Sequence, residues 1–291
     1  MNTPLAGAQQ DARQGRLVLV ADAVSWTLAS AEGVRYEVRV AWPVQPPPPA
    51  GYPVIYQLDG DATFATTVES MRTRAHRSDA TGVAPSLVVG IAPAAVVASA
   101  RERHATERHE RRSDDFTPTQ GAAQFRTFLE HVVQPAVQAA FAVDTRRTTL
   151  IGHSLGGLFV LDTLLEALHR GTSPYQTYVA ISPSIWRGGE ALWQAPEGGG
   201  AATSFAARVL LTVGEYEQAL APWQAEQANA AEILERRQAR RMVDQAQEFA
   251  AHLARVGPTL DVQCRVFAGE DHASVVLPTM SAALRLASGI R

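Results

Sequence analysis

A serine between two glycines is the strongest sign of chemistry in this chain. Ser154 lies in residues 152–156, whose letters G-H-S-L-G fit the G-x-S-x-G pattern of a nucleophile elbow. The apolar pair 150–151 precedes this pattern and a segment with helical spacing follows it, which predicts a sharp strand-to-helix turn that exposes the hydroxyl. Gly152 and Gly156 are expected to let neighbouring backbone pass close to this turn. We therefore predict that Ser154 is a nucleophile.

A serine hydroxyl needs a base, and in folds built around such an elbow the order along the chain is serine, acid, histidine. His272 follows the apolar run 262–267 and lies in a predicted loop at the carboxyl end of a strand. His169 and His252 instead lie in segments with helical periodicity. We predict that His272 is the general base, and that His153, inside the elbow, is a packing residue.

Two carboxylates are candidates for the acid that orients this histidine. Glu215 and Glu217 follow the apolar run 209–213 in the letters G-E-Y-E, and their spacing on an extended loop points them in opposite directions. The glycine-x-x-acid spacing favours Glu217, with Glu215 as the alternative acid. A serine–histidine dyad without an acid is the third possibility. Asp271 is expected to shape the loop of the histidine.

The negative oxygen of a tetrahedral intermediate requires hydrogen-bond donors, normally two backbone N–H groups. The N–H of Leu155, directly after the nucleophile, is the first candidate. The second is the N–H of Asp61, because the apolar run 54–58 is followed by D-G-D and Gly60 permits a tight turn. The side chain of Asp61 is not needed for this role and would partly oppose it.

The composition excludes several other kinds of chemistry. The chain has 291 residues, and all 26 of its basic residues are arginines. Without lysine there is no side-chain amine for a Schiff base, a P-loop or a Ser–Lys dyad. The single cysteine, Cys264, excludes an internal disulfide and multi-cysteine metal sites. We expect no cofactor and no metal ion.

Charge and hydropathy also limit the partners. A net charge of -3 gives no bulk reason to expect nucleic acid. No stretch approaches the roughly 20 apolar residues that span a bilayer, and the polar residues 1–15 lack the apolar core of a signal peptide. We expect a cytoplasmic protein without a membrane partner, with residues 1–15 as a flexible N-terminal segment. No feature indicates an oligomeric state.

Short apolar runs alternate with segments of helical periodicity, which predicts an α/β fold with a mostly parallel central sheet and helices on both faces. The predicted strands are 34–40, 54–58, 87–91, 150–151, 178–181, 209–213 and 262–267. The predicted helices are 121–141, 155–169, 224–256 and 282–286. We expect one domain over residues 1–291, with 101–118 and 188–203 as loop excursions.

Arginine and tryptophan side chains are the candidates for substrate binding. Five arginines lie between residues 101 and 112, but glutamates between them also fit a solvated, salt-bridged helix. Of this group we take Arg112 as a substrate-binding candidate, because guanidinium groups pair with carboxylates and stack on aromatic rings. Trp186 is the second candidate, while Trp193 and Trp223 could line a pocket or cover the core. The arginines of 224–256 are expected to form a solvated helix face.

Four segments together resemble the esterase-D-like esterase family of α/β-hydrolases. They are residues 58–60 (LDG), 152–157 (GHSLGG), 182–186 (SPSIW) and 214–217 (GEYE), within a similarity that runs from about Val34 to His272. The segment 182–186 and residues 115–118 are most similar to siderophore esterases of the enterochelin and salmochelin trilactone type. The resemblance implies an α/β-hydrolase fold and a siderophore substrate, ferric or iron-free. Periplasmic members are thought to use a dyad, which leaves the acid open.

The function that these observations predict is that of a serine ester hydrolase acting through an acyl-enzyme, with a small-molecule ester as its substrate. The resemblance favours a siderophore lactone or a related aromatic ester. The alternatives are an acyltransferase and a general carboxylesterase for feruloyl or acetyl esters. A non-catalytic binding protein is disfavoured, because nucleophile, base and acid candidates are all present.

Overall fold

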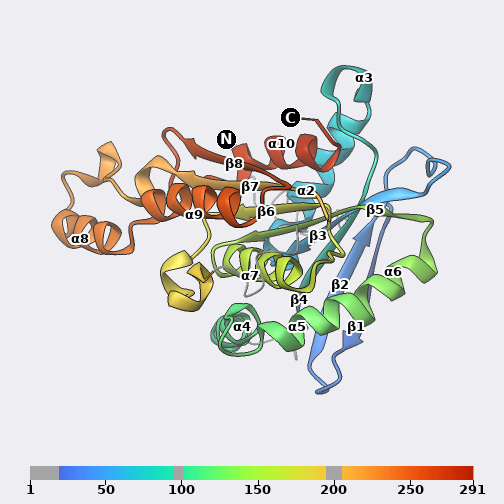
Figure 1. The fold of residues 1–291 in the computed structure, drawn as a ribbon, viewed down its shortest axis with the longest axis horizontal. Coiled ribbons are helices and arrows are strands. Elements are labelled where there is room, and N and C mark those ends of the chain that lie inside the picture. The colour runs from blue at the N-terminus through green and yellow to red at the C-terminus, as the bar shows by residue number, and fades with distance from the viewer. Residues whose placement is uncertain (1–19, 95–100, 195–204, 291) are drawn as a thin grey trace, which may run out of the picture.

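A computed structural model describes residues 20–94, 101–194 and 205–290, apart from the side chains of residues 101–108 and 191. Its centre is an eight-stranded sheet with the order β1-β2-β4-β3-β5-β6-β7-β8 (Figure 1). β1 pairs with β2 and β2 with β4 in antiparallel fashion, and all other neighbouring strands are parallel. The strands are β1 (Ala23–Ala29), β2 (Arg35–Ala41), β3 (Tyr52–Leu58), β4 (Leu87–Pro93), β5 (Val143–His153), β6 (Thr177–Ile181), β7 (Ala207–Gly214) and β8 (Leu260–Phe267).

Helices cover both faces of the sheet, which confirms the predicted α/β architecture. On one face α7 (Leu155–Arg170) packs with the helices over 101–140 and with α9 (Met242–Val256); on the other lie α2 (Gly60–Ala75) and α10 (Val276–Ala287) (Figure 1). The remaining helical elements are α3 (Ser78–Thr81), α8 (Ala230–Arg240), η2 (Ile185–Arg187), η3 (Glu190–Trp193), η4 (Glu215–Glu217) and η5 (Pro222–Gln224).

The central strands are apolar on both sides because both faces of the sheet are covered. Every residue of β3 is buried, and its side chains alternate between two cores. Tyr56 and Leu58 point into the core under α7, whereas Ile55 joins the core formed with α2 and α10. Because β3, β5, β6, β7 and β8 run parallel, their carboxyl ends lie along one edge of the sheet. Loops at this edge can carry a site.

The predicted helix 121–141 contains a local widening. It consists of α5 (Ala122–Phe128), the π-helical turn η1 (Leu129–Val133) and α6 (Gln134–Ala140). In the widened turn the N–H of Gln134 donates to the carbonyl of Leu129, five residues earlier. Pro135 follows directly, and proline cannot donate the hydrogen bond that a regular helix needs.

The predicted long helix 224–256 is broken into η5, α8 and α9. Arg241 separates the last two with a left-handed backbone (φ 47°), which a non-glycine residue adopts at some cost. Ion pairs from its guanidinium to Asp244 (3.3 Å) and Glu248 (2.5 Å) help to hold this junction. The break makes α8 a separate helix, which lies beyond the end of α9 in Figure 1.

The expected loop excursion over 101–118 is wrong for most of its length, because residues 101–116 form α4 (Arg101–Phe116). The carboxylate of Asp115 is buried at its end, where it accepts hydrogen bonds from Tyr36 (3.0 Å) and pairs with Arg111. The second expected excursion, 188–203, contains the short helix η3, and its part from residue 195 lies outside the described residues. The expected flexible segment 1–15 lies outside them too.

The described residues form neither a membrane-spanning helix nor a metal-binding cluster of side chains. None of their helices combines the length and the apolar character needed to cross a bilayer. Nor do three or more histidine, cysteine, aspartate or glutamate side chains come together there as a metal ion would require.

Candidate active site

Ser154 occupies a strained turn between β5 and α7. Its backbone dihedrals are φ 59° and ψ -115°, and its N–H donates to the carbonyl of Ile181 at the end of the neighbouring strand β6 (2.9 Å). A Cβ atom on Gly152 would overlap the carbonyl oxygen of Gly156, so the turn requires glycine at position 152. A Cβ on Gly156 itself would make only ordinary contacts, so position 156 does not share this steric requirement. The turn presents the Ser154 hydroxyl beyond the end of the sheet.

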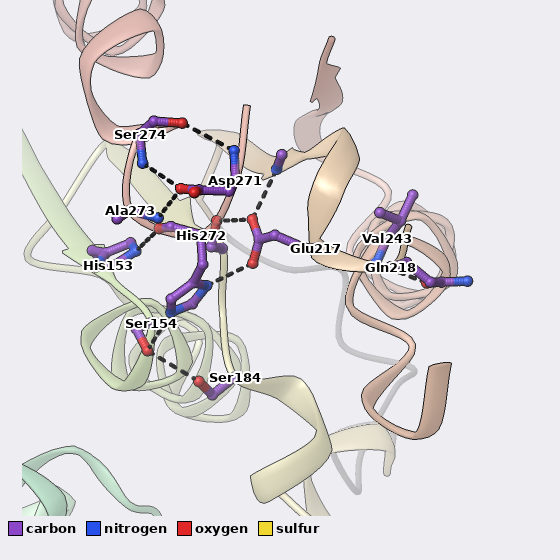
Figure 2. Close-up of polar contacts among 12 residues, drawn as sticks. His153, Ser154, Ser184, Glu217, Gln218, Val243, Asp271, His272, Ala273 and Ser274 are labelled. Atoms are coloured by element: carbon purple, nitrogen blue, oxygen red, sulfur yellow. Dashed lines mark hydrogen bonds and ion pairs between the residues drawn. The ribbon is translucent and has the colours of Figure 1, made fainter. Parts of the chain in front are cut away.

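His272 is carried by the loop between β8 and α10, and the side chain of Asp271 shapes this loop (Figure 2). Oδ1 of Asp271 accepts hydrogen bonds from the N–H groups of Ala273 (2.8 Å) and Ser274 (2.9 Å). The hydroxyl of Ser274 in turn accepts from the N–H of Asp271 (2.9 Å). The backbone hydrogen bonds, that from Ser274 foremost, lower the pKa of Asp271. Asp271 thus has the loop-forming position expected of it.

A continuous hydrogen-bonded chain joins Ser154, His272 and Glu217 (Figure 2). Nε2 of His272 is 3.0 Å from the Ser154 hydroxyl, and Nδ1 is 2.6 Å from Oε2 of Glu217. An ionised carboxylate only accepts hydrogen bonds, so Nδ1 carries the proton and Nε2 is free to accept the serine proton. This is the order of groups that activates a serine for attack on a carbonyl carbon.

The carboxylate of Glu217 is held from its other side as well. It is 4% exposed, and its Oε1 accepts hydrogen bonds from the N–H of Gly214 (2.8 Å) and from the hydroxyl of Ser182 (2.5 Å). Ser182 itself has a left-handed backbone (φ 44°), a conformation seldom adopted by non-glycine residues. Donors on both oxygens fix the direction in which the carboxylate points.

Glu215 has a different contact. Its Oε2 accepts a hydrogen bond from the N–H of Gly269 (2.8 Å), in the loop that leads to His272. The two segments also meet through their backbones, because the N–H of Tyr216 donates to the carbonyl of Glu270 (2.9 Å). Of the two candidate acids, the structure therefore brings Glu217 to His272 and Glu215 to the backbone of its loop.

Two further side chains touch these groups, and sequence reasoning gave neither a role there. His153, expected only to pack, has Nε2 2.7 Å from the main-chain carbonyl of His272, with the two rings 4.7 Å apart. The hydroxyl of Ser184 is 3.3 Å from that of Ser154, and the Ser184 N–H donates to the Ser154 carbonyl (3.0 Å). The motif S-P-S-I-W at 182–186 was the available signal for Ser184.

The two predicted oxyanion donors both lie at helix N-termini. Leu155 is the first residue of α7 and Asp61 the second residue of α2, and each helix has 16 residues. The first N–H groups of a helix have no partner within it and carry the positive end of the helix dipole. Ser154 lines two neighbouring cavities, one shared with Leu155 and one shared with Asp61. This placement suits stabilisation of a negative oxygen beside Ser154.

The cavity in front of Ser154, Glu217 and His272 has a volume of about 190 Å³ and is rich in arginine. Its other lining residues are His109, Arg112, Leu155, Ser184, Trp186, Arg187, Tyr216, Arg237, Arg240 and Met242. Arg237 and Arg240 come from α8, so part of the arginine face that was expected to be solvated borders this cavity; Arg240 is exposed and Arg237 is half-buried. The break at Arg241 makes α8 a helix separate from α9, which periodicity along one long helix could not predict.

The candidate Arg112 is already engaged within the protein. Its guanidinium binds both carboxylate oxygens of Asp59 (2.6 and 2.8 Å) and donates to the carbonyl of His153 (2.8 Å). Arg187, Arg237 and Arg240 differ, because none of them forms an ion pair with a carboxylate among the described side chains. Within the described residues these three arginines therefore add positive charge to the cavity without a direct ion pair, although Arg237 also acts electrostatically on Asp271.

Trp186 lies close to two of these cations. The guanidinium groups of Arg240 and Arg187 are 4.9 and 5.7 Å from its ring centroid, and the ring is 41% exposed at the cavity. Trp193 instead packs edge-on against Phe249 (5.0 Å), and Trp223 is largely exposed outside the cavity lining. Of the three tryptophans considered, only Trp186 contributes to this cavity.

Comparisons with known proteins agree on one family. Residues 30–256 match the family model described as "Putative esterase". The ferri-bacillibactin esterase BesA of Bacillus subtilis is 35% identical over 271 residues, covering 88% of this chain and 86% of BesA. The siderophore enterobactin esterase of Emericella nidulans is 30% identical, covering 91% of this chain and 93% of the relative.

Solved structures similar to this chain include siderophore hydrolases as well. The BES protein of Bacillus cereus is 31% identical, with a TM-score of 0.73 and coverage of 94% of this chain and 97% of that one. The siderophore hydrolase EstB of Aspergillus nidulans is 25% identical, with a TM-score of 0.76 and the same coverage of each chain. The likeness therefore extends over nearly the whole length of both proteins.

Proposed function

The chain belongs to this esterase family of α/β-hydrolases, which hydrolyse carboxylic esters, and we propose that it cleaves an ester bond of a siderophore through an acyl-enzyme on Ser154. The observation that carries the proposal is the hydrogen-bonded chain from Glu217 through His272 to Ser154, which opens into an arginine-lined cavity. The names of the relatives supply the substrate class.

In the first step, Nε2 of His272 takes the proton of Ser154 as the hydroxyl oxygen attacks the ester carbonyl carbon. Glu217 accepts a hydrogen bond from the Nδ1–H of the imidazole throughout, and its negative charge stabilises the imidazolium that forms. The C–O bond to the alcohol then breaks, and the imidazolium passes its proton to the leaving oxygen. The acyl group remains on Ser154.

In the second step, water takes the place of the alcohol. His272 removes a proton from the water as its oxygen attacks the acyl carbon, and the same proton returns to the Ser154 oxygen when the acid departs. In both steps the N–H groups of Leu155 and Asp61 hold the negative carbonyl oxygen. Removal of one such donor typically costs about 3–4 kcal/mol of transition-state stabilisation.

The cavity favours a substrate that is aromatic and negatively charged. Arg187, Arg237 and Arg240 supply positive charge, and the exposed ring of Trp186 offers a surface for stacking. A siderophore whose aromatic groups hold ferric iron through charged oxygens has both properties. The iron-free form keeps the rings but loses much of the charge. We propose the iron-loaded siderophore as the preferred substrate.

Replacement of the nucleophile tests the chemistry. We expect Ser154→Ala to fold normally but to hydrolyse neither a siderophore lactone nor a short nitrophenyl ester, because no oxygen is left to accept the acyl group. A fluorophosphonate should add covalently to the wild-type protein at Ser154, as seen by mass spectrometry, and should leave the variant unmodified. Turnover by the variant at the wild-type rate would refute the assignment of Ser154.

A substrate panel tests the specificity separately. Iron-loaded and iron-free trilactone siderophores, a feruloyl ester and a short nitrophenyl ester would be compared by kcat/KM. We expect the iron-loaded siderophore to give the highest value. Turnover of the nitrophenyl ester alone would refute the siderophore substrate and leave the ester hydrolase in place. Added alcohols that intercept the acyl group in preference to water would indicate an acyltransferase.

A further inference from the structure

We propose that His153 is a positioning residue for His272, which it holds by donating a hydrogen bond from its ring to the main-chain carbonyl of the base. The inference rests on the proposed function, because it gives His153 a task only if His272 acts as the base. It assigns a second role to the elbow, which then positions the general base as well as the nucleophile.

The geometry links two parts of the chain that are far apart in sequence. His153 is the last residue of β5 and directly precedes Ser154, whereas His272 lies in the loop after β8. Nε2 of His153 is 2.7 Å from the His272 carbonyl oxygen, and the two imidazoles are 4.7 Å apart at an interplanar angle of 44° (Figure 2). The strand that carries the nucleophile therefore also holds the residue that deprotonates it.

The chemistry of this contact determines where the proton of His153 lies. A carbonyl oxygen can only accept, so Nε2 of His153 must carry a hydrogen, and the neutral ring satisfies the contact with Nδ1 unprotonated. Desolvation of the ring and the neighbouring His272 lower the pKa of His153 to about 4, and Arg112 adds to this effect. The backbone hydrogen bond and Glu217 act in the opposite direction. Asp59 and Asp61 also line the cavity behind His153.

A neutral His153 suits a site in which His272 becomes positively charged during turnover. A second cation 4.7 Å away would disfavour the imidazolium and slow proton transfer from Ser154. His153 can hold the base without adding such a charge. Arg112 fixes the other side of this residue, because its guanidinium donates to the His153 carbonyl (2.8 Å).

Apart from the bond of Glu217 to the His272 ring, the other contacts hold the loop on either side of the base rather than at it. Glu215 holds Gly269, and the side chains of Asp271 and Ser274 hold the turn itself. The bond from His153 acts at His272, where a displacement changes the distance from Nε2 to Ser154 directly. A misplacement of about 1 Å in a catalytic group can reduce the rate about 100-fold.

Two amide variants of different length provide a matched test. In His153→Gln the side-chain N–H extends about as far as Nε2 of histidine, so it can still donate to the His272 carbonyl. In His153→Asn the same amide is too short to reach it. We expect Asn to lower kcat about 10- to 100-fold with little change in KM, and Gln to restore most of kcat. The rate of fluorophosphonate addition to Ser154 should fall and recover in parallel.

The same variants separate positioning from a role in proton transfer. If His153 only positions the base, the acid limb of the pH–kcat/KM profile stays in place in His153→Gln. A shift of this limb, or equal losses in Gln and Asn, would overturn the inference. Equal activity of Asn and wild type, with both melting at the same temperature, would overturn it as well. Failure of wild-type Ser154 to react with the fluorophosphonate would instead overturn the proposed function.

Discussion

Glu217 and Glu215 are two residues apart, yet Glu217 contacts the imidazole of His272 and Glu215 contacts the backbone of the loop before it. Glu217 places one oxygen on Nδ1 of His272 and the other between Ser182 and the N–H of Gly214. Glu215 is bonded to the N–H of Gly269. The first contact decides which ring nitrogen of the base carries the proton, whereas the second only stabilises a loop. The two residues should therefore differ widely in their effect on the reaction.

Replacement of Glu217 by glutamine tests this directly. The amide oxygen can still accept from Gly214 and Ser182, so the NH₂ group must face Nδ1 of His272. Nδ1 then becomes an acceptor, Nε2 carries the proton, and His272 can no longer take the proton of Ser154. We expect kcat in Glu217→Gln to fall about 10³- to 10⁴-fold with little change in folding. Steady-state kinetics and a thermal melt measure the two effects.

The control for this variant is Glu215→Gln. Its amide oxygen keeps the hydrogen bond to Gly269, and no catalytic nitrogen faces it, so kcat should change only a few-fold. A small loss in Glu217→Gln would indicate that Ser154 and His272 work without an acid. A large loss in Glu215→Gln would indicate that the loop contact matters more than the orientation of the imidazole.

At the residue scale, sequence order was sufficient to find Ser154, His272 and the pair of candidate acids. The elbow is a local feature, since glycine is required at position 152 by the carbonyl of Gly156 only four residues away. The contact between His153 and His272 could not be predicted, because no motif and no order along the chain link the residue before the nucleophile to the main-chain carbonyl of the base. Nothing in the sequence sets the direction of the His153 ring.

At the scale of elements, the helix α8 supplies two of the arginines that line the cavity. It brings Arg237 and Arg240 to the active site, while Arg236 on the same helix is exposed and pairs with Glu232 at 4.0 Å. Arg237 is already held by the carbonyl of Ala219 (2.6 Å) and by Gln224 (2.8 Å). Arg240 contacts the ring of Trp186 and is the better candidate for direct contact with a ligand.

We expect Arg240→Gln to raise KM for an iron-loaded siderophore about five- to tenfold, because a cation facing both the ligand and Trp186 is lost. The kcat for a short nitrophenyl ester should not change, since Arg240 does not touch the reacting groups. Arg236→Gln removes the same charge from the exposed part of the same helix and serves as the matched control. Equal rises in KM in both variants would show that net charge, rather than Arg240, attracts the ligand.

The path of α8 shows where a periodic pattern stops being informative. Hydrophobic spacing correctly placed helical structure over most of 224–256, but one uninterrupted helix would carry all four arginines of 236–241 on one rod. The left-handed residue Arg241 divides it, and helix propensity does not predict such a conformation for arginine. Because the break at Arg241 is not predictable from the sequence, the sequence also did not predict that Arg237 and Arg240 line this cavity.

At the scale of the whole molecule, the strands of the parallel part of the sheet were predictable from the sequence, whereas the edge strand β1 was not. The apolar runs of β3, β4, β6, β7 and β8 are buried on both faces or pair with such strands, so their composition indicates them. β1, in contrast, is an edge strand whose pattern is only half-buried, and it pairs antiparallel with β2. α2 presents threonine as well as apolar residues to the core, which weakens its hydrophobic period.

Buried histidines connect the site to the stability of the whole fold. The pKa of His153 is lowered to about 4, and burial also lowers the pKa of His252. In the unfolded chain a histidine binds a proton below about pH 6.5. Between pH 6.5 and 4 the unfolded state therefore binds more protons at these two positions than the folded state does. Unfolding then becomes easier as the pH falls.

The variant His153→Gln isolates the contribution of His153 to this pH dependence of the free energy of unfolding. The shift at His153 corresponds to at most about 3 kcal/mol, fully present above pH 6.5 and lost progressively towards pH 4. The variant lacks the titrating ring, so its free energy of unfolding should fall less steeply over this window than that of the wild type. Chemical denaturation at several pH values measures both slopes.

When the wild type and His153→Gln are compared, the contributions of other titrating groups to the pH dependence of stability cancel. Burial raises the pKa of Asp115, which gives a pH dependence of opposite sign, but Asp115 and His252 are the same in both proteins. The difference between the slopes therefore belongs to His153 and its neighbours His272, Arg112 and Glu217. Parallel slopes would mean that the ring of His153 takes up its proton at an ordinary pH, and that a second cation does face His272 in acid.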